Sequence, residues 1–308
     1  MSDTPHLLIP LAASHAEGCA QAMQRLALPH LDALLARLTP LEADAGEETD
    51  FAPPHERALA HHLHLPGAPT PWAAWHARRQ DGAWAFITPC QWHVGADHVT
   101  LTDPAALRLD EADSRALLAI LAPWFAEDGI TLAYDQPTRW LARGAVFEGL
   151  ATASLDRVVQ RDVRAWLPDT GQARPIHRLH SEMQMLLYTH PFNDARAARG
   201  LPPVNAFWVH GAGALPQPPA PVAPPEVPAT LRDAALREDW PAWTAAWQAL
   251  DAGPIARLAA HVAAGGTARL TLCGERGALA WHAAPRGLRQ MIQSLFKPQR
   301  FTSLREQL

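Results

Sequence analysis

The chain has 308 residues, of which 48% are hydrophobic and 19% charged, and its formal net charge is -5. This composition is that of a globular protein with one large domain or two modest ones, and it excludes a disordered chain and a strongly basic nucleic-acid binder. No apolar run reaches the roughly 20 residues that span a bilayer, and three scattered cysteines form neither a disulfide framework nor a zinc pattern. We therefore expect a cytoplasmic protein.

Apolar periodicity along the chain predicts helices and strands in alternation. Leucines at i, i+3, i+4 and i+7 indicate a helix over 29–38, and the clearest helix pattern runs over 110–127, where Gly129 provides the stop. The other predicted helices lie at 54–65, 71–79, 154–166, 176–188, 194–199, 231–250, 254–264 and 286–296. The predicted strands lie at 6–11, 83–88, 99–101, 130–134, 139–141, 204–209, 268–273 and 278–281.

The segment 214–228, which reads ALPQPPAPVAPPEVP, separates two parts of the chain. Proline lacks the backbone N–H and fixes φ, so we predict an extended polyproline connector on the surface, with docking of an SH3-like partner as the alternative. Helices and strands alternate regularly at both ends of the chain, which favours a layered α/β core. The middle of the chain mixes them less regularly, as an α+β unit does.

Polar residues and glycines cluster after the predicted helix at 176–188. The Arg196 guanidinium can hold a carboxylate or a phosphate through two parallel hydrogen bonds, and Asn205 can orient a hydroxyl. Ligands of open α/β sheets bind at the carboxyl ends of strands, where glycines allow close approach. The sequence predicts a site for a small anionic ligand at Asn193, Arg196, Asn205, His210, Gly211 and Gly213. The alternative is structural, with a helix cap, an ion pair and a turn.

Two segments carry donor atoms that suit a transition metal. The first contains Cys90, His93, Asp97 and His98. The second is the histidine run His55, His61, His62 and His64. Neither has a regular ligand spacing, so we interpret the first as a loop that leaves a strand and the second as a solvated helix surface, with a metal site as the alternative for each. We predict no cofactor.

The same region resembles a known family. Residues 190–213 contain HPFNDAR, RGLPPVNAFW and GAG, and this block is similar to one in the archaeal-type cofactor-independent phosphoglycerate mutases, which belong to the alkaline phosphatase superfamily. Residues 179–213, which include SEMQMLLY, resemble more closely the bacterial RpfE-type regulatory proteins. Further matches to that group along most of the chain are TPCQWHVGADHV, FAEDGITL, ASLDRV and LTLCGE.

The sequence departs from the mutases at the residues that carry their chemistry. The superfamily normally ends its first strand in Asp-Gly, whose aspartate binds metal, whereas this chain has Leu11 and Ala12 there. The stretch comparable to the nucleophile region reads FAPPHE at 51–56, without a serine, and no Asp-His pair follows Gly213. Two-metal phosphoryl transfer needs several such ligands. The resemblance therefore implies the fold and argues against the activity.

The resemblance implies an alkaline phosphatase-like layered α/β core at 1–68 and 186–308, which includes the connector at 214–230, with an inserted α+β unit at 69–185. It implies a regulatory or ligand-binding protein without catalysis. The alternative is an enzyme that acts on phosphorylated sugar acids and then needs a divalent metal. We expect a small anionic ligand and an unidentified protein partner, and we expect neither a membrane nor a nucleic acid as partner.

Overall fold

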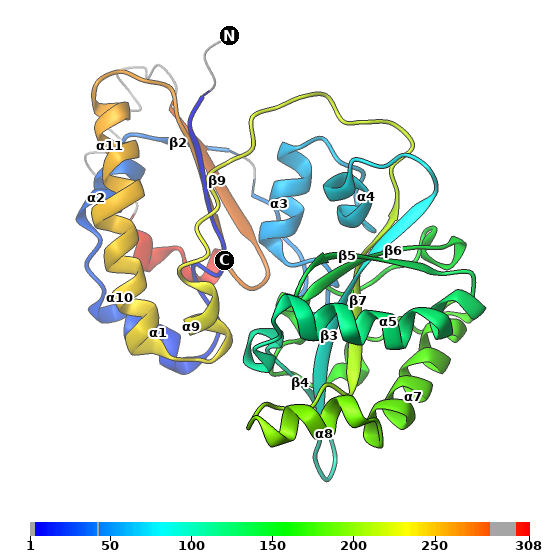
Figure 1. Cartoon of the computed structure of the whole chain (residues 1–308). Helices are drawn as coiled ribbons and strands as arrows, with labels where there is room; N and C mark the ends of the chain where they lie inside the picture. The colour runs from blue at the N-terminus through cyan, green and yellow to red at the C-terminus, as the bar shows by residue number, and fades with distance from the viewer. Residues whose placement is uncertain (1–3, 42, 284–299) are drawn as a thin grey trace. The chain divides into compact units, whose positions relative to one another are not determined.

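The chain forms a mixed α/β fold of two compact units (Figure 1). The computed structural model describes residues 4–41, 43–283 and 300–308. Unit 1 contains residues 1–63 and 221–308, and unit 2 contains residues 64–220. Unit 2 is therefore inserted in the sequence of unit 1, and it is longer than the predicted insertion at 69–185.

The insertion ends at residue 220 instead of residue 185 because of one strand. Strand β7 (Ala206–Ala214) pairs with β3 (Ala83–Val94), from Ala83 opposite Ala214 to Cys90 opposite Ala206. This long antiparallel pairing places residues 186–213, which we expected in the first unit, in unit 2. Both strands run well past their predicted ends, and β3 continues through Pro89.

Unit 1 is built on a four-stranded sheet with the order β1-β8-β9-β2. These strands are β1 (His6–Ile9), β8 (Arg269–Cys273), β9 (Ala278–His282) and β2 (Thr39–Pro40). Strands β1 and β8 are parallel, with His6 opposite Arg269 and Leu8 opposite Thr271, while the other pairs are antiparallel. The predicted strands at 6–11, 268–273 and 278–281 are confirmed. The parallel pairing places His6 and Arg269, the first residues of β1 and β8, at the same end of the sheet.

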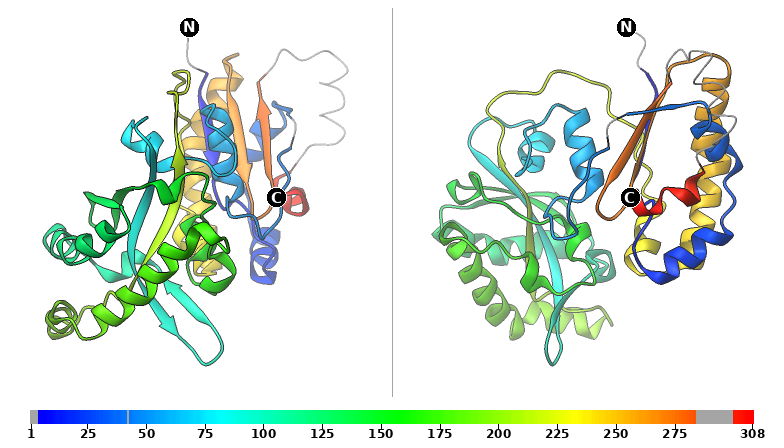
Figure 2. Two further views of the ribbon diagram at one scale, coloured as in Figure 1. Left: turned by 90° about the vertical axis from the view of Figure 1, so that its right-hand side faces the viewer. Right: turned by 180° about the vertical axis from the view of Figure 1, so that it is seen from behind.

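Helices cover both faces of this sheet (Figures 1 and 2). Leu7 and Ile9 point into a large core that includes Trp243 and Trp247. Leu8 points to the opposite face, where a small core lies under α3 (Pro54–His62). The helices that contribute to the large core are α1 (Glu17–Arg25), α2 (Pro29–Leu35), α9 (Arg232–Leu236), α10 (Trp240–Leu250) and α11 (Ala256–Ala263).

A single π-helical turn, Asp251–Ile255, joins α10 to α11. It contains Pro254, which lacks the N–H that a regular helix would need at this point. Asp251 is only 4% exposed, and its carboxylate accepts hydrogen bonds from the backbone N–H groups of Leu31, at 2.8 Å, and His30. The turn therefore supplies the cap for the amino-terminal end of α2, which has no side-chain cap of its own.

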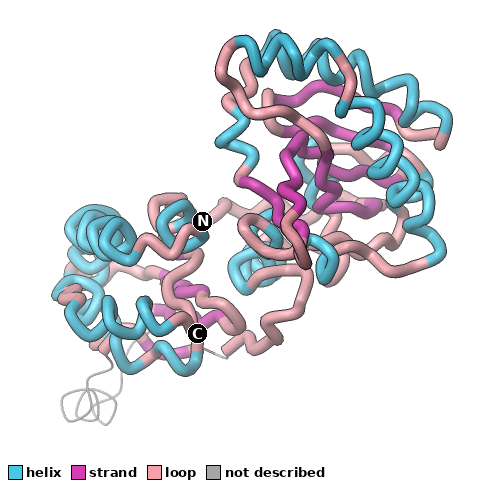
Figure 3. The backbone as a smooth tube through the Cα atoms, turned by 90° about the horizontal axis from the view of Figure 1, so that it is seen from below, coloured by secondary structure: helices cyan, strands magenta, loops and turns pink. Residues whose placement is uncertain are grey.

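Unit 2 contains a five-stranded antiparallel sheet with helices on both faces, and Figure 3 shows strands and helices in this arrangement. Besides β3 and β7, its strands are β4 (Val99–Thr102), β5 (Thr131–Gln136) and β6 (Arg139–Arg143). One face packs on α5 (Glu111–Glu127) and α7 (Arg174–Tyr188), and the other contacts α4 (Trp72–Ala77). Short helices α6 (Leu155–Val158) and α8 (Pro191–Ala198) complete the unit.

Two predicted helices differ from the structure, and a third cannot be compared with it. The helix at 154–166 ends at Val158, because Val159 and Asp162 form bridges with β4. The helix at 231–250 is divided into α9 and α10 around Glu238, which has a positive φ. The helix at 286–296 lies outside the described residues. Over the described part of the chain, none of the helices combines the length and apolar character needed to cross a membrane.

Candidate functional site

The predicted anion-binding arginine is used inside unit 2. The Arg196 side chain is 1% exposed. Its Nη1 donates to the Asp113 carboxylate at 3.0 Å, its Nε donates to the Pro202 carbonyl at 2.9 Å, and its Nη2 donates to the Leu107 carbonyl. Burial lowers the pKa of Arg196, and the Asp113 carboxylate opposes this effect. The guanidinium thus ties three segments together instead of facing a cavity.

The two predicted asparagines also bind the backbone. Asn193 Nδ2 donates to the carbonyls of Leu187 and Val204, both at 2.8 Å, and its oxygen accepts from the Val204 N–H. Asn205 binds the backbone of Trp92 in β3: its oxygen accepts from the Trp92 N–H at 2.7 Å, and its Nδ2 donates to the Trp92 carbonyl at 2.9 Å. Both asparagines therefore make structural contacts, as the alternative to a ligand site expects. The residue that caps α8, however, is His190 rather than Asn193.

The remaining predicted residues lie farther along β7. His210 Nε2 is 3.0 Å from Thr88 Oγ1 in β3, and burial lowers the pKa of His210 to about 3. Gly211 and Gly213 do not leave the strand in a turn but continue it. A Cβ atom on Gly211 would lie 2.9 Å from Trp72 Cβ, so the glycines allow close packing on α4. None of the six predicted residues lines any of the three cavities described below.

The four predicted metal donors at 90–98 are not gathered. Cys90 is buried in β3, and burial raises the pKa of its thiol. Asp97 and His98 lie exposed in the turn that joins β3 to β4, where the His98 ring contacts the Asp97 carboxylate at 2.6 Å. Over residues 4–41, 43–283 and 300–308, no three His, Cys, Asp or Glu side chains are grouped closely enough to hold a metal ion.

The carboxyl ends of β1 and β8 are covered by other residues of unit 1. The Glu275 carboxylate accepts hydrogen bonds from Ser14 Oγ at 3.3 Å and from the His15 N–H at 2.9 Å. Arg305 donates to the carbonyls of the same two residues. Ligands of open α/β sheets commonly bind at this edge. In this chain the polar groups there bind one another.

The opposite end of the β1–β8 pair borders a cavity of about 420 Å³, next to α3, which we call the α3 pocket. The parallel pairing places the first residues of both strands at this cavity, and the last turn of α3 adds two histidines. Its polar lining residues are His6, Asp44, Arg57, His61, His62, Arg269 and Thr271. The pocket therefore combines residues from four segments of unit 1.

His6 is a half-buried residue with one unused ring atom. Its Nε2 lies 2.9 Å from Thr271 Oγ1, and its ring meets the His62 ring edge-on at 4.7 Å. Its Nδ1 is buried and has no hydrogen-bond partner among the described residues. Burial, and to a lesser extent the nearness of His62 and Arg269, lowers the pKa of His6 to about 3. At neutral pH the ring is uncharged, and Nδ1 is a buried polar atom that a ligand can satisfy.

The charge of the α3 pocket is positive. Asp44 is the one carboxylate among the described lining residues, and Arg57 neutralises it through a hydrogen bond of 2.9 Å. The Arg269 guanidinium is half-buried and has no hydrogen-bond or ion-pair partner in the described chain. A cavity with an unpaired arginine and three histidines fits a small anion.

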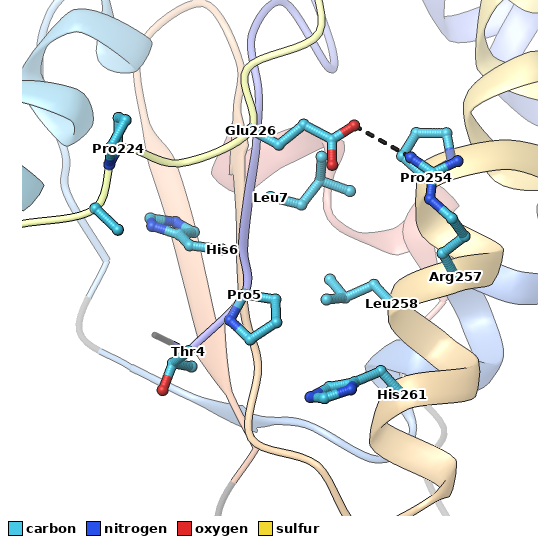
Figure 4. Close-up of a pocket in the computed structure, with 11 residues that line it drawn as sticks. Thr4, Pro5, His6, Leu7, Pro224, Glu226, Pro254, Arg257, Leu258 and His261 are labelled. Carbon is cyan, nitrogen blue, oxygen red and sulfur yellow. Dashed lines mark hydrogen bonds and ion pairs between the residues drawn. The ribbon is translucent and has the colours of Figure 1, made fainter. Parts of the chain in front are cut away.

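A second cavity, of about 400 Å³, lies on the other side of β1, against α11 (Figure 4). Glu226 of the connector lines this cavity and pairs with the edge of β1, because its N–H donates to the His6 carbonyl at 2.8 Å and its carbonyl accepts from the Leu8 N–H at 2.9 Å. Figure 4 shows the Glu226 carboxylate paired with Arg257, at 3.3 Å. His6 lines this α11 pocket as well as the α3 pocket, but among the described residues the pairing of Arg257 with Glu226 leaves the α11 pocket without an unpaired arginine.

A third cavity, of about 580 Å³, lies in unit 2 at the carboxyl end of α4. Trp75 and Arg79 line it, and Arg79 also lies over the Trp84 ring at 5.6 Å. The carbonyl end of a helix carries a partial negative charge, which attracts arginines and repels an anion. The α3 pocket is therefore the stronger candidate for an anion site.

The sequence contained a partial signal for the α3 pocket. The histidine run that contains His61 and His62 is visible in the sequence. Its interpretation as a solvated surface does not include the contact between His62 and His6. His6 and Arg269 carried no signal, because 263 residues separate them and only the parallel register brings them together. The one feature that the two positions share in the sequence is that His6 and Arg269 each begin an apolar strand.

Neither a protein-family model nor a curated protein matches the sequence. Among solved structures, the chain is similar to the cofactor-independent phosphoglycerate mutase from Thermoplasma acidophilum, with 13% identity, coverage of 92% of this chain and 90% of that chain, and a TM-score of 0.35. It is also similar to the PH0037 protein from Pyrococcus horikoshii, with 13% identity, coverage of 95% and 93%, and a TM-score of 0.41. Both values describe a distant similarity in fold.

Proposed function

We propose that this protein binds a small anion in the α3 pocket and acts through that binding rather than through turnover. The observation that carries the proposal is a cation and a buried polar atom in one cavity, neither of which has a partner among the described residues. Arg269 supplies the charge, and His6 Nδ1 supplies a hydrogen-bonding position that no described residue fills. An anion would satisfy both at once, because charge-assisted hydrogen bonds are the strong ones.

The arrangement at the carboxyl ends of β1 and β8 supports binding over catalysis. Glu275 and Arg305 are engaged with the Ser14–His15 segment, so the groups at this edge already have partners. As part of the same proposal, we place the protein with regulatory proteins of the RpfE type, for which an anion would serve as a signal. A protein partner that reads the bound state belongs to this proposal as well.

Titration of the full chain with inorganic phosphate and with sulfate, followed by calorimetry, tests the proposal. Arg269→Gln should weaken binding of both by at least about tenfold, because it removes the only unpaired charge among the described lining residues. Arg257→Gln is the matched control, because Arg257 is an exposed arginine that lines the α11 pocket and is paired with Glu226. It should leave binding unchanged.

Two outcomes would contradict the proposal. One is binding that is equally weak, or equally strong, in the wild-type chain and in both variants. The other is steady turnover of a phosphorylated sugar acid in the presence of manganese by the purified wild-type chain, which would favour the enzymatic alternative.

A further inference from the structure

The α3 pocket is lined by His6, a histidine whose ring is uncharged at neutral pH. This inference rests on the proposed anion site. Within the described part of the chain, His6 Nδ1 is buried without a hydrogen-bond partner, and the centroids of the His6 and His62 rings are 4.7 Å apart. We propose that the α3 pocket takes up a proton together with its anion, and that the proton resides on His6 Nδ1, between the ring and the bound anion.

The charges around His6 explain why the proton and the anion enter together. In the empty pocket, nearby positive charge and burial oppose protonation of the ring. A bound anion reverses the sign of the local field and accepts a hydrogen bond from the Nδ1–H group. The proton comes from solvent, and no covalent bond forms or breaks. The titratable or charged groups that face His6, from every element packed against it, are Asp44, Arg57, His61, His62, Glu226, Arg257, His261 and Arg269.

Among these groups, most of the charges are already balanced. Asp44 is paired with Arg57, and Glu226 is paired with Arg257. The uncompensated cation is Arg269, which lies opposite His6 in the register of β1 and β8. A proton on His6 would add a second positive charge beside an anion held between Arg269 and His6, and this charge would strengthen binding.

The other two histidines differ from His6 in their access to water. His61 is exposed, and His62 is half-buried with its Nε2 at 2.9 Å from the Ala223 carbonyl. Neither carries a buried unsatisfied nitrogen, so neither gains a missing hydrogen bond when an anion binds. The coupling between proton and anion therefore depends on His6.

Sulfate is the appropriate probe, because it has no proton of its own to gain near neutral pH. For the wild-type chain, the dissociation constant for sulfate should rise by up to about tenfold per pH unit between about pH 6 and about pH 8. Calorimetry in two buffers of different ionisation enthalpy should count about one proton taken up per sulfate. His6→Gln keeps an amide that can bond Thr271 but cannot be protonated, so the pH dependence should disappear while weak binding remains.

His61→Gln is the control and should keep most of the pH dependence. Wild-type binding of sulfate without proton uptake overturns this inference, whether or not His6→Gln folds. So does an unchanged pH dependence in His6→Gln, because the proton would then reside elsewhere. A complete lack of sulfate binding at every pH overturns the proposed function itself, and the inference with it.

Discussion

Arg196 connects three segments of unit 2 that are distant in sequence. Its guanidinium bonds Asp113 at the start of α5, the Leu107 carbonyl, and the Pro202 carbonyl beyond α8. Arg199 shares the Asp113 carboxylate from the solvent side. The Arg199 hydrogen bond is the largest influence that lowers the pKa of Asp113. The carboxylate therefore serves one buried arginine and one half-exposed arginine.

Removing these arginines one at a time should show that the buried ion pair of Arg196 contributes more to the free energy of unfolding than the surface ion pair of Arg199. Arg196→Ala leaves the two carbonyls and part of Asp113 without a partner, so we expect the free energy of unfolding to fall by about 3–5 kcal/mol. Arg199→Ala removes a side chain that is 49% exposed and should cost only about 0–1 kcal/mol. Urea denaturation of the full chain measures both values, and equal losses would refute this assignment.

The sequence could not assign Arg196 to this role. Arg196 lies three residues after Asn193 in α8, but Asp113 lies 83 residues earlier in the chain. An arginine near glycines and an asparagine has the same local pattern whether its partner is a ligand or a buried carboxylate. Only the packing of α5 against the α8 region distinguishes the two.

Strand β7 shows how a close contact determines the length of an element. The strand was predicted to end at Val209, because glycines follow and glycine is common in turns. Gly211 instead adopts a φ of +61° within the strand, where its missing side chain makes room for Trp72 of α4. The glycines therefore extend the pairing with β3 by allowing a helix to pack closely on the sheet.

Adding a methyl group should reveal this contact. Gly211→Ala combines a positive φ with a Cβ that would lie 2.9 Å from Trp72 Cβ, and we expect a loss of more than about 2 kcal/mol in the free energy of unfolding. Gly200→Ala is the matched variant, because its φ is +67° but its Cβ would meet nothing within 4 Å. It should cost about 1 kcal/mol. Thermal or urea denaturation that ranks Gly200→Ala as the more damaging change would contradict this view.

Other elements were predicted well where the local pattern decided the structure. The helix at 110–127 and the hairpin over 130–141 have clear periodicity and turn residues, and both are confirmed. The helix at 154–166 failed because Val159 and Asp162 bridge to β4, which is a tertiary contact. Arg157 and Arg164 therefore lie in separate short helices instead of on one continuous helix.

Across the whole molecule, three histidines are kept uncharged by their surroundings. The pKa values of His6, His180 and His210 are each lowered to about 3, with burial as the largest cause. His6 belongs to unit 1 and the other two belong to unit 2, so both units carry a group of this kind. Composition shows 16 histidines but cannot show which of them are buried.

Acid should therefore destabilise both units. In the unfolded chain these histidines bind protons near pH 6.5, whereas in the folded chain they do so only near pH 3, so the unfolded state holds more protons between these values. The free energy of unfolding should decrease as the pH falls from about 6.5 toward 3, by up to about 1.4 kcal/mol per pH unit for each histidine. Urea denaturation at several pH values measures this slope. His180→Gln should flatten it for unit 2, and an unchanged slope would count against the prediction.

The pairing of β1 with β8 has a consequence for biosynthesis. All the residues of unit 2 are contiguous in the chain. Strand β1, by contrast, pairs with β8, which is synthesised more than 250 residues later. On the ribosome, unit 2 can complete its folding while the first strand still lacks its neighbour. Strand β1 is thus among the last segments to be fixed in place, and nascent unit 1 would leave Leu8 and Ile9 exposed throughout translation of the insertion. Chaperones that hold apolar nascent segments would have their longest opportunity at this strand.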